Sequence, residues 1–378
     1  MILNEEQSFI RETARKVARE RLAPTAAIRD RDCRFPAGEL AELGRLGFMG
    51  MVVPRAWGGA ETDYVSYVAA IMEIAAGDGP ISTIMGEHTS VCCLPVLTYG
   101  TEEQKNRFLR PMARGEMIGC FCLTEPEAGS DPASIKTIAR KDGRSGYVIS
   151  GTKQFITSGR NGSVGIVFAV TDPNAGKKGI SAFVVPTNTP GWTVTRVEEK
   201  MGQRSSDTCA LSFDDMWVPA DSLLGREGEG LRVALSHLDG GRLGIAAQSV
   251  GMGRAAFEHA LGYAKERRQF GKLLIEHQAV AFRLADMATR LEAAEQLVLH
   301  VAAMRDAGLP CFKEASMAKV LASETAERVC SDAIQTLGGY GYLADFPLER
   351  IYRDVRVCQI YEGTGDMQRL VIARALTG

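Results

Sequence analysis

The sequence predicts a mainly helical α+β protein: an N-terminal helical domain, a middle β domain and a C-terminal four-helix bundle. Two observations lead to this fold class. Apolar residues recur every three to four positions toward both ends of the chain, whereas short β-branched segments separated by Gly, Asn, Asp and Pro fill the middle. The 378 residues allow two or three domains, and we place them at 1–116, 117–222 and 223–378.

The first domain is expected to consist of helices. Within residues 5–24 we expect a helix with one apolar face, and Pro24 is expected to end it. The residues near that face are Phe9, Ile10, Thr13, Val17 and Leu22. Residues 63–78 predict a mostly buried helix. Thr101, followed three residues later by Gln104, predicts a capping box at the start of another helix.

The other two domains differ in the period of their apolar residues. Segments 146–157, 163–170, 179–186, 192–197 and 209–219 predict short strands. Short strands with turn-rich joints are typical of a small sheet, a sandwich or a barrel. Segments 229–267, 277–308, 312–339 and 366–376 return to the helical period. A four-helix bundle is the economical packing for four such helices.

Composition excludes several classes of protein. The formal net charge of −2 argues against a broad nucleic-acid-binding surface. No apolar run reaches the roughly 18–20 residues that span a bilayer, so no stable membrane insertion is expected, and we see no secretory signal. Nine scattered cysteines without a CxxC pair argue against a disulfide framework or a zinc site. We therefore expect no metal and a cytoplasmic location, such as the bacterial cytosol.

Four short motifs carry most of the functional information. They are FCLTEPEAGSD at 121–131, KERRQFGK at 265–272, QTLGGYGY at 335–342 and YEGTGDMQR at 361–369. Each also has a structural interpretation: a connector loop, a basic helix end that complements the helix dipole, a C-cap and a glycine-flanked turn. In the functional interpretation, small residues and free backbone N–H groups approach a flat or anionic cofactor, and an arginine pairs with its phosphates.

In this order, with a β region after the first, the four motifs resemble the acyl-CoA dehydrogenase family over essentially the whole chain. The resemblance implies the fold of that family, a FAD cofactor and α,β-dehydrogenation of an acyl-CoA thioester to trans-2-enoyl-CoA. In that reaction a base abstracts the C2 proton and flavin N5 accepts hydride from C3. The resemblance also implies an electron-transferring flavoprotein as partner and a homotetramer built as a dimer of dimers. We expect a short- to medium-chain or branched acyl group.

The resemblance implies that the first motif and the strand end at 153–159 form one part of the flavin site. The implied flavin contacts are Phe121, Leu123, Thr124, Gly129, Ser130, Phe155 and Thr157. Ser130 could also reach the CoA ester. Family members usually have tyrosine in place of Phe121 and tryptophan in place of Phe155, so both phenylalanines depart from the pattern.

A second group of residues is implied to contact the flavin of a neighbouring subunit. Arg267 would pair with its pyrophosphate through bidentate hydrogen bonds. The other implied contacts are Phe270, His277, Gln278, Gln335, Gly338 and Gly339. A cofactor shared in this way requires at least a dimer.

The resemblance makes Glu362 the expected catalytic base. A free glutamate has a pKa of about 4.3, and burial against the acyl chain and Tyr361 should raise that pKa toward the working pH. The backbone N–H of Glu362 and a flavin ribityl hydroxyl would polarise the thioester carbonyl. Some relatives carry the base directly before the arginine that matches Arg242, but this sequence has Gly241 there.

The remaining implied contacts surround this base. The resemblance assigns Ser130, Asp239, Arg242, Tyr361 and Gly363 to the substrate, and Thr364 and Asp366 to the flavin. Asp239 and Arg242 lie three residues apart on one helix face, a spacing that by itself indicates a surface ion pair worth ~0.2–0.5 kcal/mol. Relatives often have glutamine in place of Asp366. Thr364 or Asp366 is also expected near the N-cap of the last helix.

Three alternatives remain open at this point. An acyl-CoA oxidase or flavin monooxygenase on the same scaffold would react with oxygen. A non-catalytic, DNA-associated relative is expected to carry a basic C-terminal extension, which this sequence does not show. A flavin-free helical scaffold protein would lack yellow colour.

Overall fold

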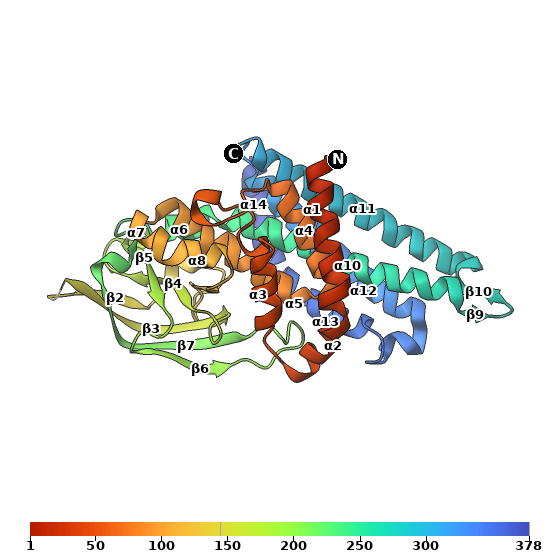
Figure 1. Ribbon diagram of the computed structural model, residues 1–378, viewed down its shortest axis with the longest axis horizontal. Coiled ribbons are helices and arrows are strands. Elements are labelled where there is room, and N and C mark those ends of the chain that lie inside the picture. The colour runs from red at the N-terminus through yellow and green to blue at the C-terminus, as the bar shows by residue number, and fades with distance from the viewer. Residues whose placement is uncertain (144, 378) are drawn as a thin grey trace.

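The computed structural model describes residues 1–143 and 145–377, apart from the side chain of Asp239. Helices come first, a β-sheet follows, and long helices complete the chain, so the predicted fold class is confirmed. In Figure 1 the sheet lies at one end of the molecule, helices of the N-terminal region cross its middle, and the long C-terminal helices extend to the opposite end.

The N-terminal region is a set of helices around one buried helix. Its α-helices are α1 (Glu5–Val17), α2 (Ala23–Asp32), α3 (Ala37–Arg45), α4 (Tyr64–Gly77), α5 (Gly79–Glu87), α6 (Leu94–Tyr99), α7 (Glu102–Gln104) and α8 (Arg110–Ala113). Helix α4 is buried along almost its whole length, as predicted. The predicted capping box of Thr101 and Gln104 starts α7.

The prediction that Pro24 ends the first helix is wrong. Helix α1 continues through a π-helical turn, Ala18–Leu22, directly into α2. Pro24 lies in the first turn of α2, where its missing N–H and fixed φ cost little. Of the predicted face, Leu22 is buried and Ile10 and Val17 pack against the core, but Phe9 is 73% exposed. The small side chain of Ala14 is also buried, which lets α1 approach α4 closely.

The middle region forms one eight-stranded sheet with the order β6-β7-β3-β2-β4-β5-β8, and β1 pairs with β4 in parallel. The strands are β1 (Gly119–Cys122), β2 (Ile138–Asp142), β3 (Gly146–Thr157), β4 (Val164–Val170), β5 (Ile180–Pro186), β6 (Trp192–Val197), β7 (Thr208–Pro219) and β8 (Leu223–Leu224). The register of β3 with β7 is irregular between Lys153 and Ile156. Phe155 lies in this irregularity with a φ of 59°, and its ring is exposed on the isolated chain.

The C-terminal region is the predicted helical bundle. Its elements are α9 (Gly230–Ser236), α10 (Leu238–Glu266), the short strands β9 (Arg268–Gln269) and β10 (Lys272–Leu273), α11 (Gln278–Asp306), α12 (Phe312–Leu337), α13 (Leu348–Val355) and α14 (Gly365–Thr377). Helix α10 packs against both α12 and α4. At Gly251 of α10, an added Cβ would lie 2.1 Å from the carbonyl oxygen of Met72, so only glycine permits this approach. No helix in the described part of the chain is long and apolar enough to cross a membrane.

Buried ion pairs tie the N-terminal helices to the bundle. Glu73 of α4 accepts hydrogen bonds from Arg11 and Arg15 of α1 at 2.8 and 3.1 Å, and lies 2.7 Å from Arg254 of α10. Burial alone would raise the pKa of Glu73, but the three arginines outweigh it and lower that pKa. One carboxylate therefore joins three helices from distant parts of the sequence.

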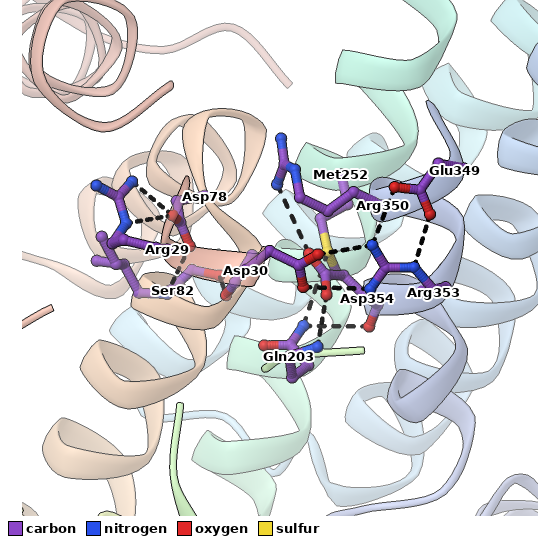
Figure 2. A network of polar contacts seen from close by, with 12 residues as sticks. Arg29, Asp30, Asp78, Ser82, Gln203, Met252, Glu349, Arg350, Arg353 and Asp354 are labelled. Carbon is purple, nitrogen blue, oxygen red and sulfur yellow. Dashed lines mark hydrogen bonds and ion pairs between the residues drawn. The ribbon is translucent and has the colours of Figure 1, made fainter. Parts of the chain in front are cut away.

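A second cluster of buried charges joins α2, α5 and α13 (Figure 2). Arg29 donates to Asp78 at 2.9 and 2.6 Å, and both side chains are buried. Next to this pair, Arg353 of α13 donates to Asp30 of α2 at 2.6 Å. The cluster fixes α13, and with it the chain that leads to the fourth motif.

Glu73→Gln is expected to lower the free energy of unfolding by about 3 kcal/mol, because it leaves three arginines without their buried carboxylate. Denaturant unfolding measures this change. The matched control Glu12→Gln removes an exposed partner of Arg15 and should change stability by less than ~0.5 kcal/mol. Since the pKa of Glu73 is lowered, the loss should be full at neutral pH and shrink as the pH falls below about 4.3. Equal effects of the two substitutions would contradict this account.

Candidate active site

A cavity of about 670 Å³ lies where the N-terminal helices, the sheet and the bundle meet. Its walls come from α5, the loop after β1, the end of β3, α10 and α14. The predicted site residues that line it are Phe121, Leu123, Thr124, Gly129, Ser130, Phe155, Thr157, Arg242, Tyr361, Glu362 and Gly363. A cavity of this size is typical of small-molecule sites.

The turn that carries Glu362 has an unusual backbone. Glu362 and Gly363 have φ values of 55° and 87°, so two consecutive residues are left-handed and one of them is not glycine. Gln368, buried on α14, donates to both of their carbonyl oxygens at 3.1 and 3.0 Å. Thr364 accepts a hydrogen bond from the backbone of Met367 and so caps α14, as predicted. The turn directs its carbonyls toward the helices and the Glu362 side chain into the cavity wall.

The pKa of the Glu362 carboxyl group lies near neutral pH. Burial raises its pKa to about 7, although Arg242 and Lys319 both lower it. Oxygen Oε2 is buried and accepts no hydrogen bond within the described chain. Arg242 is itself buried, with its guanidinium over the Phe312 ring at 4.6 Å. A carboxyl group with this pKa can act as a general base near neutral pH.

Gly241 of α10 leaves the space that the Glu362 carboxyl group occupies. An added Cβ at Gly241 would lie 2.7 Å from Oε2 of Glu362 and 2.9 Å from its Cδ. The Glu362 carboxyl group therefore lies against the backbone of α10 at this residue. A side chain at 241 and the carboxyl group of Glu362 compete for one volume.

A buried ion pair between Lys153 and Glu125 fixes the loop after β1. Lys153 of β3 donates to Glu125 at 2.8 Å and to the carbonyl oxygen of Leu123 at 3.1 Å. Glu125 also accepts from the backbone N–H groups of Lys136 and Thr137 at 2.6 and 3.0 Å. With Glu125 held in this way, the small-residue segment of the first motif lies open to the cavity.

Three family profiles match the chain in sequence order. They describe the N-terminal domain (residues 4–116), the middle domain (residues 120–216) and the C-terminal domain (residues 228–377) of acyl-CoA dehydrogenase. An acyl-CoA dehydrogenase of Bacillus subtilis is 47% identical over 379 residues, which covers 100% of both chains. The chain belongs to the acyl-CoA dehydrogenase family.

Other acyl-CoA dehydrogenases and their structural relatives agree with this assignment. The mitochondrial short-chain specific acyl-CoA dehydrogenase of Bos taurus is 46% identical over 98% of this chain and 90% of that protein. Butyryl-CoA dehydrogenase from Megasphaera elsdenii superposes with a TM-score of 0.98 at 40% identity, over 100% of both chains. A chain in a structure reported for the electron transferring flavoprotein of Acidaminococcus fermentans has a TM-score of 0.98 at 42% identity and covers 100% of this chain and 99% of that one. PigA with FAD and proline has a TM-score of 0.96 at 30% identity, over 100% and 99%. The predicted family and enzyme class are confirmed.

Within this acyl-CoA dehydrogenase fold, one group of predicted residues lies far from the cavity. The group is Arg267, Phe270, His277, Gln278, Gln335, Gly338 and Gly339. They lie around β9, β10 and the ends of α10 and α12, at the opposite end of the bundle from the sheet (Figure 1). One chain does not bring them to its own cavity, so their role toward a second subunit stays a prediction.

Of the other predicted residues, Thr364 and Asp366 are not in the cavity wall. The Thr364 side chain is occupied as the cap of α14. The Asp366 side chain is 97% exposed and lies 4.0 Å from Arg369. Asp239 lies on α10, but its side chain is outside the described part of the structure. Flavin or substrate contacts of these residues remain predictions.

Sequence analysis missed Glu87, a second carboxyl group in the cavity wall. Burial and then the negative charge of Glu362 raise the pKa of Glu87 well above its ordinary value, while Thr157 and the backbone of Phe121 hydrogen-bond to it. Both effects favour the neutral form of Glu87. Glu87 ends an apolar helix and belongs to none of the four motifs, so only its position in space marks it.

The buried end of the cavity is closed by a chain of hydrogen bonds that the sequence also did not indicate. Tyr361 donates its hydroxyl to Gln248 at 2.6 Å, and Gln248 donates to Thr83. Thr83 donates to Gln203 at 2.9 Å, and the backbone N–H of Gln203 donates to Asp354, as Figure 2 shows. Tyr361, the residue before Glu362, is thus connected to the charged cluster around α13.

Gly241→Ala is expected to lower turnover by ~10–10²-fold, because the new methyl group displaces the carboxyl group of Glu362 by a fraction of an ångström or more. Bound flavin, measured by absorbance, should be retained. Gly262→Ala on the same helix is the control, since an added Cβ there meets nothing within 4 Å. Wild-type turnover in Gly241→Ala would refute the close packing described for Glu362.

Proposed function

We propose that this protein catalyses FAD-dependent α,β-dehydrogenation of an acyl-CoA thioester, with Glu362 as the base. One observation carries the proposal: a carboxyl group with a pKa raised to about 7 and one unpartnered oxygen stands in the wall of a 670 Å³ cavity. Such a group can take a proton from a weak carbon acid near neutral pH. The names of two similar proteins, a short-chain specific acyl-CoA dehydrogenase and a butyryl-CoA dehydrogenase, support the same reaction.

The cavity wall fits a flavin. Phe155 is 64% exposed and offers the face of its ring, and Thr124 and Thr157 offer hydroxyl groups. At Gly129 an added Cβ would meet nothing within 4 Å, so that part of the loop is open to a flat ligand. Phe121 and Leu123 complete the set that would hold the ring. When bound, the flavin supplies the acceptor for the C3 hydride.

The residues of this chain perform the proton transfer. Glu362 removes the C2 proton, which ends on its carboxyl group. The backbone N–H of Glu362 donates to no group within the described chain, so it is free to donate to the thioester carbonyl as negative charge develops there. Arg242 and Lys319 favour the ionised carboxylate before the transfer. At the exposed mouth, Lys177 and Arg374 offer positive charge to the phosphates of CoA.

The second subunit and the electron acceptor belong to the same proposal. The distant residues around Arg267 lie beside highly exposed aromatic side chains, Phe270 at 94% and Tyr342 at 84%. A second copy would bury these rings and place Arg267 near the flavin that the copy holds, so we propose a dimer as the minimal unit and a dimer of dimers as the full assembly.

Similarity to a chain in the electron transferring flavoprotein structure supports such a flavoprotein as the acceptor. All nine cysteines are free thiols, which supports a reducing, cytoplasmic location.

The buried end of the cavity supports a short acyl chain. Thr83, Gln248 and Tyr361 use their polar groups on one another there, and a long chain would press methylene groups against them. In a panel of straight and branched acyl-CoAs, kcat/KM should be highest for butyryl- or hexanoyl-CoA. The kcat/KM for dodecanoyl-CoA should be at least ~10-fold lower, because each methylene group without an apolar contact loses ~0.8 kcal/mol of binding free energy. Gln248→Ala should shift this preference toward longer chains, and a wild-type maximum at dodecanoyl-CoA would contradict it.

Glu362→Gln is expected to keep flavin and lower dehydrogenation by at least ~10²-fold, because the amide cannot accept the C2 proton. Turnover with butyryl-CoA and an artificial electron acceptor measures this, while oxygen consumption is recorded without the acceptor. Glu102→Gln, a surface change on α7, is the control. Substantial turnover in Glu362→Gln would refute the base, and rapid peroxide release by the wild type would favour the oxidase alternative. Colourless purified protein would favour a scaffold role.

A further inference from the structure

Lys319 is a buried cation beside the turn of the base. Its side chain on α12 has no exposed surface, and its Nζ donates to the carbonyl oxygen of Gly363 at 2.6 Å. Lysine is almost never fully buried without a partner. Within the described chain no carboxylate lies within 4.0 Å of it, so the backbone of the catalytic turn is the partner that it has.

The charges around this turn come from four elements. Arg242 of α10 and Lys319 of α12 place positive charge near Glu362, and Glu87 of α5 is a second acid near it. Cys358, on the 3-10 turn before the motif, is a buried thiol close to Lys319. Burial lowers the pKa of Lys319 to about 8, with Cys358 and Glu362 opposing that shift. Two buried cations and a second acid, whose neutral form is favoured, thus act on the base.

The carbonyl oxygens of the turn do not need a lysine at position 319 as their hydrogen-bond donor. Gln368 already donates to the carbonyl oxygens of both Glu362 and Gly363, so the turn would keep a hydrogen-bond donor without Lys319. A neutral side chain would also avoid the cost of burying a charge, which is large. What Lys319 alone adds is positive charge applied through a hydrogen bond to the peptide next to the base.

We propose that Lys319 is a positioning residue for the base: its ammonium group holds the Gly363 peptide in the left-handed turn and keeps the neighbouring Glu362 carboxylate ionised when substrate excludes water. This inference rests on the proposed function, because it takes Glu362 as the base. Lys319 does not itself touch the reacting carbon.

Three substitutions separate the hydrogen bond from the charge. Lys319→Met removes both, Lys319→Gln keeps a donor, and Lys319→Arg keeps the charge. In Lys319→Met, kcat should fall by ~10–10²-fold, the loss expected when a reacting group is displaced. KM for butyryl-CoA should change by less than ~3-fold, because substrate-binding residues stay in place. Lys313→Met, on the surface of the same helix, is the matched control and should behave as wild type.

The pH dependence gives the second readout. Glu362 acts as a base only when ionised, so kcat/KM rises as the pH passes its pKa. Because Lys319 lowers that pKa, the acidic limb should move to higher pH in Lys319→Met and Lys319→Gln and stay in place in Lys319→Arg. Lys319→Arg keeps its charge over the whole range, because a guanidinium stays protonated.

Infrared titration of Glu362 provides a readout that does not depend on turnover. The band of its protonated carboxyl group is identified by its loss in Glu362→Gln, and it should persist to higher pH in Lys319→Met than in the wild type. An unchanged band and an unchanged acidic limb in Lys319→Met would overturn the proposal. If Lys319→Met does not fold, the same comparison between Lys319→Gln and Lys319→Arg decides the question. Turnover retained in Glu362→Gln would instead refute the base assignment, while the infrared shift would still report on Lys319.

Discussion

The chemistry of this site depends on removing one carboxylate from water. Oε2 of Glu362 is buried and accepts no hydrogen bond within the described chain, so the charged form loses hydration that the protein does not fully replace. That deficit raises the proton affinity of the group, and Arg242 and Lys319 limit the rise. In the proposed role of Glu362 as the base, the cations favour the charged form, and burial gives it the higher proton affinity that a carbon acid requires.

The three structural regions are joined by the same kind of interaction that tunes the site. Glu73 draws α1, α4 and α10 together through three arginines, and the cluster of Figure 2 joins α2, α5 and α13. From Asp354 in that cluster, hydrogen bonds lead through Gln203, Thr83 and Gln248 to Tyr361. Tyr361, the residue beside Glu362, is therefore connected to the contacts between regions, and the cavity exists only where all three regions meet.

Local patterns in the sequence predicted the regular elements and the four motifs, because both are recorded in short stretches of chain. Contacts between distant segments were missed. In the sequence, Lys319 is one polar residue on an amphipathic helix, but the carbonyl group to which it donates, that of Gly363, lies 44 residues away. Gln248 and Glu87 stand in helices without any motif, and only the packing of α10 and α5 brings them to the cavity. The prediction that Pro24 ends the first helix was wrong because a π-helical turn lets the helix continue past this residue.

Gly241 also restricts which substitutions this chain can accept. An acid at position 241 would enter the space that the Glu362 carboxyl group already fills, because only a missing Cβ keeps the two apart. If Glu362 has the proposed role, moving that role to an acid at position 241 requires two changes in this chain. An acid gained first at 241 collides with the Glu362 side chain, and a residue 362 shortened first leaves the site without the proposed base. Positions 241 and 362 must therefore change together.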